Sequence, residues 1–174
     1  NTGLVIFEDS EGIARQIDFL DAPGGLTKRD VRDTAVPIEI EAIDGDPVRV
    51  LVMHPERCME SRIFNVMVLG QRGPVALDQL RRSIECAAEY SHYLLRSPGP
   101  RKVERQRAVL KLNERIAAKC LRDRRFRDIH LEFDVDPFDA VVTDEALPKQ
   151  FITRRYPQLK AKLEEQRERD RVHK

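Results

Sequence analysis

Two kinds of side chain in this sequence could do chemistry: a carboxylate suited to a hard cation, and arginines suited to phosphate. Asp18 is flanked by Ile17 and by Phe19 in a segment with strand character, and an ionised carboxylate among apolar residues needs a partner. Carboxylate oxygens suit Mg²⁺, and two such ions can stabilise both the attacking and the leaving oxygen of a phosphoryl transfer. One aspartate alone cannot assemble that site.

The arginines have a different chemistry, because a guanidinium fork can bind phosphate oxygens in a bidentate way. Arg62 falls in the second turn of a predicted helix, and Arg72 in the loop after it. Each also has an ordinary structural role open to it. Arg62 could form a surface salt bridge with Glu56 or Glu60, and Arg72 could be an exposed loop arginine.

The aspartate has ordinary alternatives as well. Asp18 could cap the end of its strand or pair with Arg15. Asp21, at the start of a Pro-Gly-Gly loop, is a nearby rival that we expect to be solvated. These alternatives stay open on the sequence alone.

Cysteine and histidine spacing argues against a zinc site and against a disulfide framework. The cysteines are far apart, lie in segments of helical periodicity and form no Cys-x-x-Cys motif, and no two histidines are four residues apart (Cys58, Cys86 and Cys120; His54, His92, His130 and His173). We therefore expect a reducing compartment. Because no apolar run approaches the length of a membrane span and no signal pattern opens the chain, we predict a cytoplasmic protein without a membrane partner.

The elements that would position these residues divide into a strand-rich first third and a helical remainder. Alternating apolar residues predict four strands, arranged as a meander, and Thr27 is placed to cap a short helix over Lys28–Thr34 (strands at 4–7, 14–20, 38–41 and 48–53). A strong hairpin signal, Asp44-Gly45-Asp46-Pro47, separates the last two strands. The fold class we predict is α/β (α+β), with a mixed, mainly antiparallel N-terminal sheet.

Helical periodicity dominates from Pro55 onward. It predicts helices from Pro55 to near Gly70, from Val75 to Arg96 and from Lys102 to Arg122. A last helix is predicted from Pro157 to Lys174, and we expect it to fray beyond Leu163. We place the domain boundary between 1–70, the sheet with its following helix, and 71–174, the helical region with a charged tail. Between the last two helices, the run 122–127 is interpreted as a charged connector, and the alternation of Ile129, Leu131, Phe133 and Val135 as an edge strand or an extended segment.

Charge is unevenly distributed along the chain. Residues 1–96 carry 11 Lys and Arg against 16 Asp and Glu, whereas residues 97–174 carry 20 against 14, a net charge of +6. On composition alone a solvated helical surface is the favoured explanation, and a half that faces nucleic acid is the alternative.

Two stretches together resemble a known family. They are Arg15-Gln16-Ile17-Asp18-Phe19-Leu20 and the segment Val50 to Arg62, in which a strand enters a helix that begins with proline. They are similar to bacterial nucleotidyltransferase-like proteins of the polymerase-β-type superfamily, including members paired with antitoxins, and the similarity continues weakly through 110–116 and 136–140. The resemblance implies that Asp18 is a catalytic, metal-binding carboxylate and that Arg62 holds the triphosphate. Asn65 and Arg72 are weaker nucleotide-binding candidates.

The family pattern is incomplete in this chain. A Gly-Ser or Gly-Gly turn and an Asp-x-Asp pair should precede the carboxylate that Asp18 matches, and neither occurs upstream of it. Asp134-Val135-Asp136 has the letters of that pair but follows the helices, which is the wrong order. Because the sequence begins at Asn1 without methionine, we expect a fragment that lacks the first motif, that is inactive as supplied and that binds Mg²⁺ only with the missing carboxylates.

The predicted function is therefore metal-dependent transfer of an NMP group from an NTP to an unknown acceptor, such as a tRNA, a protein side chain or a small molecule. Possible partners are an antitoxin-like protein or an RNA acceptor. The alternative is a non-catalytic module that binds a protein or a nucleic acid, the latter through 122–127 and the last helix. Interleaved acidic residues and an aromatic content of 6% argue against recognition by base stacking.

Overall fold

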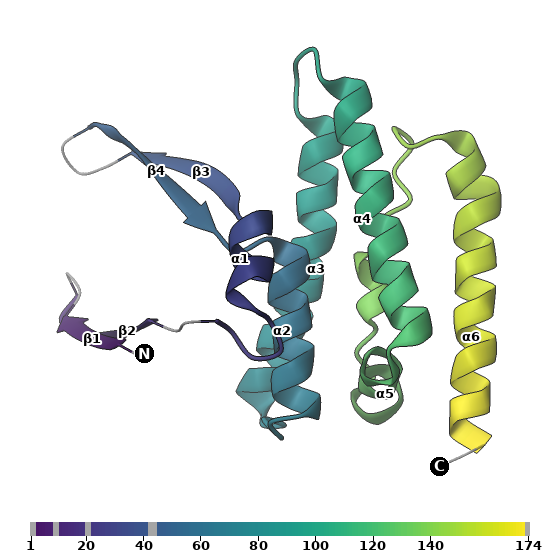
Figure 1. Ribbon diagram of the computed structural model, residues 1–174, viewed down its shortest axis with the longest axis horizontal. Coiled ribbons are helices and arrows are strands. Elements are labelled where there is room, and N and C mark those ends of the chain that lie inside the picture. The colour runs from purple at the N-terminus through teal and green to yellow at the C-terminus, as the bar shows by residue number, and fades with distance from the viewer. Residues whose placement is uncertain (1–2, 9–10, 20–21, 42–44, 173–174) are drawn as a thin grey trace. The chain divides into compact units, whose positions relative to one another are not determined.

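The computed structural model describes residues 3–8, 11–19, 22–41 and 45–172. The chain divides into two compact units, Asn1–His54 and Pro55–Lys174. The described part of the first unit is mostly paired strands with one short helix, and the second unit is helical (Figure 1). The α+β class is confirmed at this level, with antiparallel strands preceding helices.

The first unit contains two separate β-hairpins. Strand β1 (Gly3–Glu8) pairs antiparallel with β2 (Ala14–Phe19), and β3 (Val36–Glu41) pairs antiparallel with β4 (Pro47–Val52). All four predicted strands are present. Within the described residues each hairpin is its own two-stranded sheet, so the predicted meander is not formed there.

The short helix α1 (Lys28–Thr34) confirms the predicted cap at Thr27. The Thr27 hydroxyl accepts a hydrogen bond from the backbone N–H of Asp30 at 3.1 Å, and the Asp30 carboxylate accepts one from the backbone N–H of Thr27 at 3.0 Å. This reciprocal arrangement satisfies two donors that a helix start otherwise leaves unpaired.

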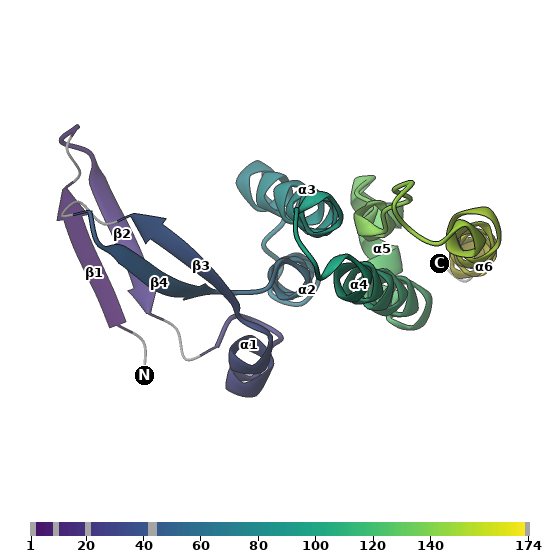
Figure 2. The ribbon, with the colours of Figure 1, turned by 90° about the horizontal axis from the view of Figure 1, so that it is seen from above.

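The described part of the second unit is built from the four predicted helices, one helix that we did not predict, and two short helical turns. Helices α2 (Pro55–Met67), α3 (Pro74–Arg96) and α4 (Lys102–Arg122) are confirmed, and they are followed by α5 (Arg124–Phe133), the 3₁₀ turn η1 (Pro137–Ala140), the π-helical turn η2 (Phe151–Arg155) and α6 (Tyr156–Val172). Figure 2 shows α2, α3, α4 and α6 nearly end-on, so their axes run in similar directions. None of the helices in the described residues is long and apolar enough to cross a membrane.

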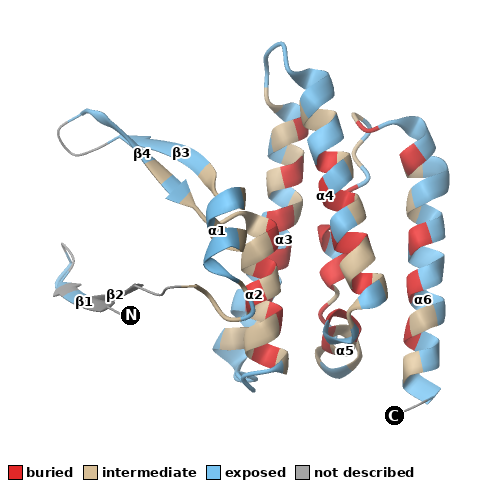
Figure 3. Ribbon diagram, viewed as in Figure 1, coloured by how far each residue is buried: buried red, intermediate tan, exposed pale blue. Residues whose placement is uncertain are grey.

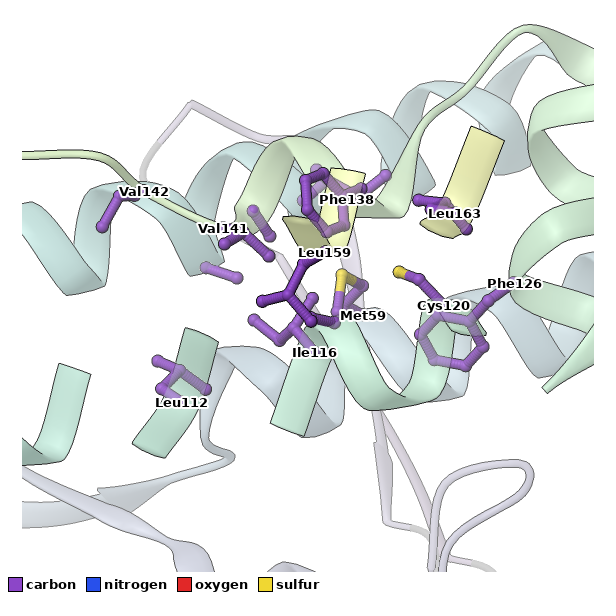
Figure 4. Close-up of a cluster of buried hydrophobic side chains, with 14 of the residues drawn as sticks. Met59, Leu112, Ile116, Cys120, Phe126, Phe138, Val141, Val142, Leu159 and Leu163 are labelled. Atoms are coloured by element: carbon purple, nitrogen blue, oxygen red, sulfur yellow. The ribbon is translucent and has the colours of Figure 1, made fainter. Parts of the chain in front are cut away.

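A single hydrophobic core holds this unit together. Met59 of α2, Ile116 of α4 and Leu163 of α6 are all 0% exposed, and Figure 4 shows them packed with aliphatic and aromatic neighbours from α4, α5 and η1. Asn113 is also fully buried, and its amide donates to the carbonyl of Val142 at 2.9 Å. That bond ties the segment after η1 to α4.

The segment 122–135 differs from our prediction, because a helix replaces both the connector and the extended strand. The Asp123 carboxylate caps α5 by accepting from the backbone N–H of Arg125, and Asp134 ends the helix in the left-handed conformation, with φ 53°. Phe126, Ile129 and Phe133 recur at helical spacing, and the first two are buried. Ile129 and Phe133 fit both the two-residue period of a strand and the spacing of a helix. The caps at Asp123 and Asp134 favour the helix.

The charged end of the chain is also more ordered than we predicted. Helix α6 continues past Leu163 to Val172, and Arg167, only 2% exposed, forms ion pairs with Asp136 and Glu164. Arg127 of α5 pairs with Asp170 in the last turns of α6. Long-range ion pairs therefore anchor a segment whose composition alone predicts fraying.

Candidate functional site

Asp18, the predicted catalytic carboxylate, lies in β2, where its Cα partner is Leu4 of β1. The side chains of Asp18 and Arg15 are outside those that the structure describes, and Asp21 lies outside the described residues altogether. The strand is therefore confirmed, and the metal-binding role of Asp18 stays a prediction. A carboxylate has the right donor chemistry for Mg²⁺, but a single one is too few for two ions.

Arg62 and Asn65 both lie on α2 and are partly exposed. Arg62 has no ion pair within 4.0 Å among the described side chains, because Glu56 and Glu60, its suggested partners, bind other cations. The backbone carbonyl of Asn65 accepts a hydrogen bond from the N–H of Gln71 at 3.0 Å and so helps to close the end of the helix.

Arg72 is attached to α5. Its guanidinium lies 3.7 Å from the carboxylate of Glu132 and 5.6 Å from the centre of the Phe133 ring. In the described part of the chain, no hydrogen bond or ion pair joins Arg72 to either of the two α2 candidates. The predicted nucleotide-binding residues are therefore not directly bonded to one another.

A different group of cations does come together, at the junction of α4 and α5. These residues line a groove of about 600 Å³, which we call the α4–α5 groove (Arg115, Ala118, Lys119, Arg122, Asp123, Arg124 and Arg125). Only Asp123 among the lining residues is acidic. The connector predicted over 122–127 gave no sign of this groove, although basic residues recur at helical spacing before it.

Two glutamates of α2 hold the α4 side of this groove. Glu56, with a side chain 2% exposed, accepts hydrogen bonds from Nε and Nη2 of Arg115 at 3.1 and 2.7 Å. Hydrogen bonding to Glu56 raises the pKa of Arg115. Glu60 pairs with Lys119 of α4 and with Arg57 of its own helix. A buried carboxylate, Glu56, and a partly buried one, Glu60, therefore fix the position of both α4 cations.

On the α5 side of the groove, Asp123 orients Arg125. Its carboxylate accepts from Nε and Nη2 of Arg125 at 3.0 and 2.6 Å. Burial opposes ionisation of Asp123, but the side-chain and backbone hydrogen bonds from Arg125 prevail and lower the pKa of the carboxyl group. Arg125 also lies 6.0 Å from the centre of the Phe64 ring, and Arg124 pairs with Asp128 at 3.3 Å. The groove thus presents cations that are already oriented.

The basic character continues along α4 away from the groove. Between Lys102 and Arg127 there are ten Lys and Arg against three Asp and Glu. Arg107, Lys111 and Arg122 are exposed, and none of the three has an ion pair within 4.0 Å among the described residues. Figure 3 shows exposed positions recurring along α4 between the buried ones.

The described residues contain no group of three or more His, Cys, Asp and Glu side chains that could hold a metal ion. The comparisons with known proteins assign no relatives: no protein-family model matches the chain, and neither a curated protein nor a solved structure is significantly similar to it. The geometry of the α4–α5 groove is therefore the main ground for a functional argument.

Proposed function

We propose that this chain is part of a nucleotidyltransferase-like protein and that its helical unit binds the phosphate groups of an NTP in the α4–α5 groove. The observation that carries the proposal is the convergence of five cations from two helices on one groove. Four of them are oriented by carboxylates, which leaves Arg122 as the unpaired cation of the set within the described residues.

The oriented arginines suit a phosphate ligand for a specific reason. Arg115 and Arg125 each use Nε and Nη2 for a carboxylate, and their Nη1 atoms have no hydrogen bond among the described residues. A phosphate oxygen can accept from these free donors without displacing the carboxylates. Because the side chains are already ordered, binding costs less conformational entropy than it would for free arginines.

The test of phosphate binding is a calorimetric titration with ATP, with and without Mg²⁺. We expect the double variant Arg122→Ala/Arg125→Ala to bind ATP at least about tenfold more weakly, because each lost charge-assisted hydrogen bond is worth about 1.5–3 kcal/mol. Arg169→Ala/Arg171→Ala, two exposed arginines of α6, is the matched control. Equal affinity in the wild type and the groove variant would refute the proposal, and a parallel titration of Arg62→Ala tests the residue that the resemblance favours.

The transfer reaction is the second part of the proposal, and the family resemblance supports it. An acceptor oxygen or nitrogen attacks the α-phosphorus, the bond to pyrophosphate breaks, and the acceptor loses its proton to solvent. Bound Mg²⁺ would stabilise the charge that develops on the phosphate oxygens and on the leaving pyrophosphate, and Asp18 would be one of its ligands together with carboxylates that the resemblance places on a preceding segment. The cytoplasmic setting and an antitoxin-like or RNA partner stay predictions with it.

The transfer step is tested with labelled NTP and a mixture of RNA and protein acceptors, on the full protein that the gene encodes. Asp18→Asn keeps the shape of the side chain and removes its charge, so label transfer should be lost while the fold is kept. Asp33→Asn, which removes an exposed carboxylate of α1, is the control. Undiminished transfer by Asp18→Asn would rule out the metal-binding role.

A further inference from the structure

We infer that the α4–α5 groove is one end of a longer cationic face that binds the phosphate backbone of a nucleic acid. The inference rests on the proposed phosphate-binding function of the groove and names a polymer as a ligand of the same surface. We call this surface the cationic face of α4 (Arg107, Lys111, Arg115, Lys119 and Arg122).

The five residues share one side of the helix. At 100° per residue they fall within an arc of about 120°, and the buried residues Val109, Asn113 and Cys120 lie on the opposite side of α4. From Arg107 to Arg122 the helix rises about 22 Å at 1.5 Å per residue. Phosphates of one strand of a B-form duplex are about 3.4 Å apart along its axis, so the face spans about six of them.

Three of the five cations on this face, Arg107, Lys111 and Arg122, have no ion pair among the described residues, and that separates the face from an ordinary solvated surface. Helix α6 shows the ordinary case, because its exposed arginines pair with glutamates one turn away, Arg169 with Glu165 and Arg171 with Glu168. On α4, Glu56 and Glu60 neutralise two cations from α2, whereas Arg107 and Lys111 have no ion pair among the described residues.

The arrangement of these cations suits a polymer better than a single nucleotide. Arg107 lies about four helical turns from Arg122, farther than one triphosphate reaches from the groove. A row of cations along a helix instead matches the repeating charge of a phosphate backbone. The face carries no aromatic residue, so we expect backbone binding that is strongly salt-dependent and largely independent of base sequence.

The inference is tested by fluorescence anisotropy with a labelled 20-base-pair RNA duplex, the matching DNA duplex and one RNA strand. The variant Arg107→Glu/Lys111→Glu should bind the duplexes at least about tenfold more weakly than the wild type. The slope of its plot of log affinity against log salt concentration should be less steep by about 2, because two phosphate contacts are lost. Lys149→Glu/Arg154→Glu changes the net charge equally at two exposed positions elsewhere and should weaken binding much less.

The same variants separate this inference from the proposed nucleotide site. Arg107→Glu/Lys111→Glu should bind ATP as the wild type does, whereas Arg122→Ala/Arg125→Ala should lose ATP and weaken duplex binding. If ATP does not bind but the duplexes do and depend on Arg107 and Lys111, the nucleotide proposal fails and the nucleic-acid face stands. Three results would overturn the face itself: no duplex binding by the wild type, an equal loss in the Lys149/Arg154 control, or tighter binding of a poly-glutamate peptide than of RNA.

Discussion

The two units of this chain are stabilised in different ways. Among the side chains whose burial the structure describes, every buried hydrophobic one belongs to Pro55–Lys174. In the first unit, by contrast, α1 buries no residue, and Ile38 and Ile40 of β3 are 40% and 48% exposed. The helices of the second unit therefore depend on a shared core, whereas α1, β3 and β4 depend on local hydrogen bonds and cross-strand pairs. Isolated two-stranded hairpins are marginally stable in water, so we expect the two units to differ in stability.

The largest expected effect comes from opening a cavity in the helical core. Ile116→Ala removes a fully buried side chain of α4 and should lower the free energy of unfolding by about 2–5 kcal/mol. Ile40→Ala, on the half-exposed face of β3, should cost less than about 1 kcal/mol. Urea unfolding followed by far-ultraviolet circular dichroism measures both. Similar losses in the two variants would abolish the contrast between the units.

Removing the buried arginine of α6 should rank next. Arg167→Ala leaves Asp136 without its ion-pair partner and should destabilise the helical unit by about 3 kcal/mol. Arg171→Ala, which breaks an exposed pair on the same helix, should change stability by less than about 0.5 kcal/mol. The two midpoints in one urea series give the comparison, and equal midpoints would mean that Arg167 is not an anchor.

The ordering of α6 shows where sequence reasoning reached its limit in the fold. Local signals were enough for the cap at Thr27 and for the starts of α2 and α4, because the residues that decide them lie within one turn. Arg167, however, is fixed by Asp136, which lies 31 residues earlier in the chain. Composition reports the charge of the last helix and carries no information about that partner, so it predicts fraying.

In the candidate site, too, local features can be predicted from the sequence and long-range contacts cannot. The individual cations of α4 can be read from their helical spacing, but the groove depends on Asp123 starting a new helix directly after α4. It also depends on two α2 glutamates that lie far from Arg115 and Lys119 in the sequence. The carboxylates that contact each cation in the folded chain decide which cations are neutralised. The excess of positive charge can therefore be predicted from the sequence, whereas the surface that carries it cannot.

Acid should weaken the helical unit through Asp144, which lies in the segment between η1 and η2. Its carboxylate accepts from the backbone N–H of Ala146 and contacts Nδ1 of His92, each within 3.1 Å. The hydrogen bond from Ala146 is the main cause that lowers the pKa of Asp144 below its ordinary value of 3.8; burial opposes the shift, and His92 and Arg96 add to it.

The sign of this pH dependence follows from a folded-state pKa that is lower than the unfolded one. The stabilisation is fully present above about pH 4 and is lost as the pH falls through the folded-state pKa. Asp144→Asn should cost about 1–2 kcal/mol at pH 7 and should flatten the acid limb of the stability curve. Urea midpoints between pH 2 and pH 7 measure this, and an unchanged acid limb in the variant would show that other carboxylates control it.

The smallest effect should be confined to the first unit. Thr27→Ala removes the hydroxyl that caps α1, and such a loss costs about 1 kcal/mol of helix stability. A seven-residue helix is marginal without its cap, so the amide of Asp30, which donates to that hydroxyl, should exchange with solvent about fivefold faster. Thr27→Ser keeps the hydroxyl and should retain most of the protection. Because α1 buries no residue, the urea midpoint of the helical unit should not change, and hydrogen exchange read residue by residue distinguishes the two regions. If the core amides of α4 lose protection together with Asp30, the units unfold cooperatively, and the contrast between local and core stabilisation is wrong.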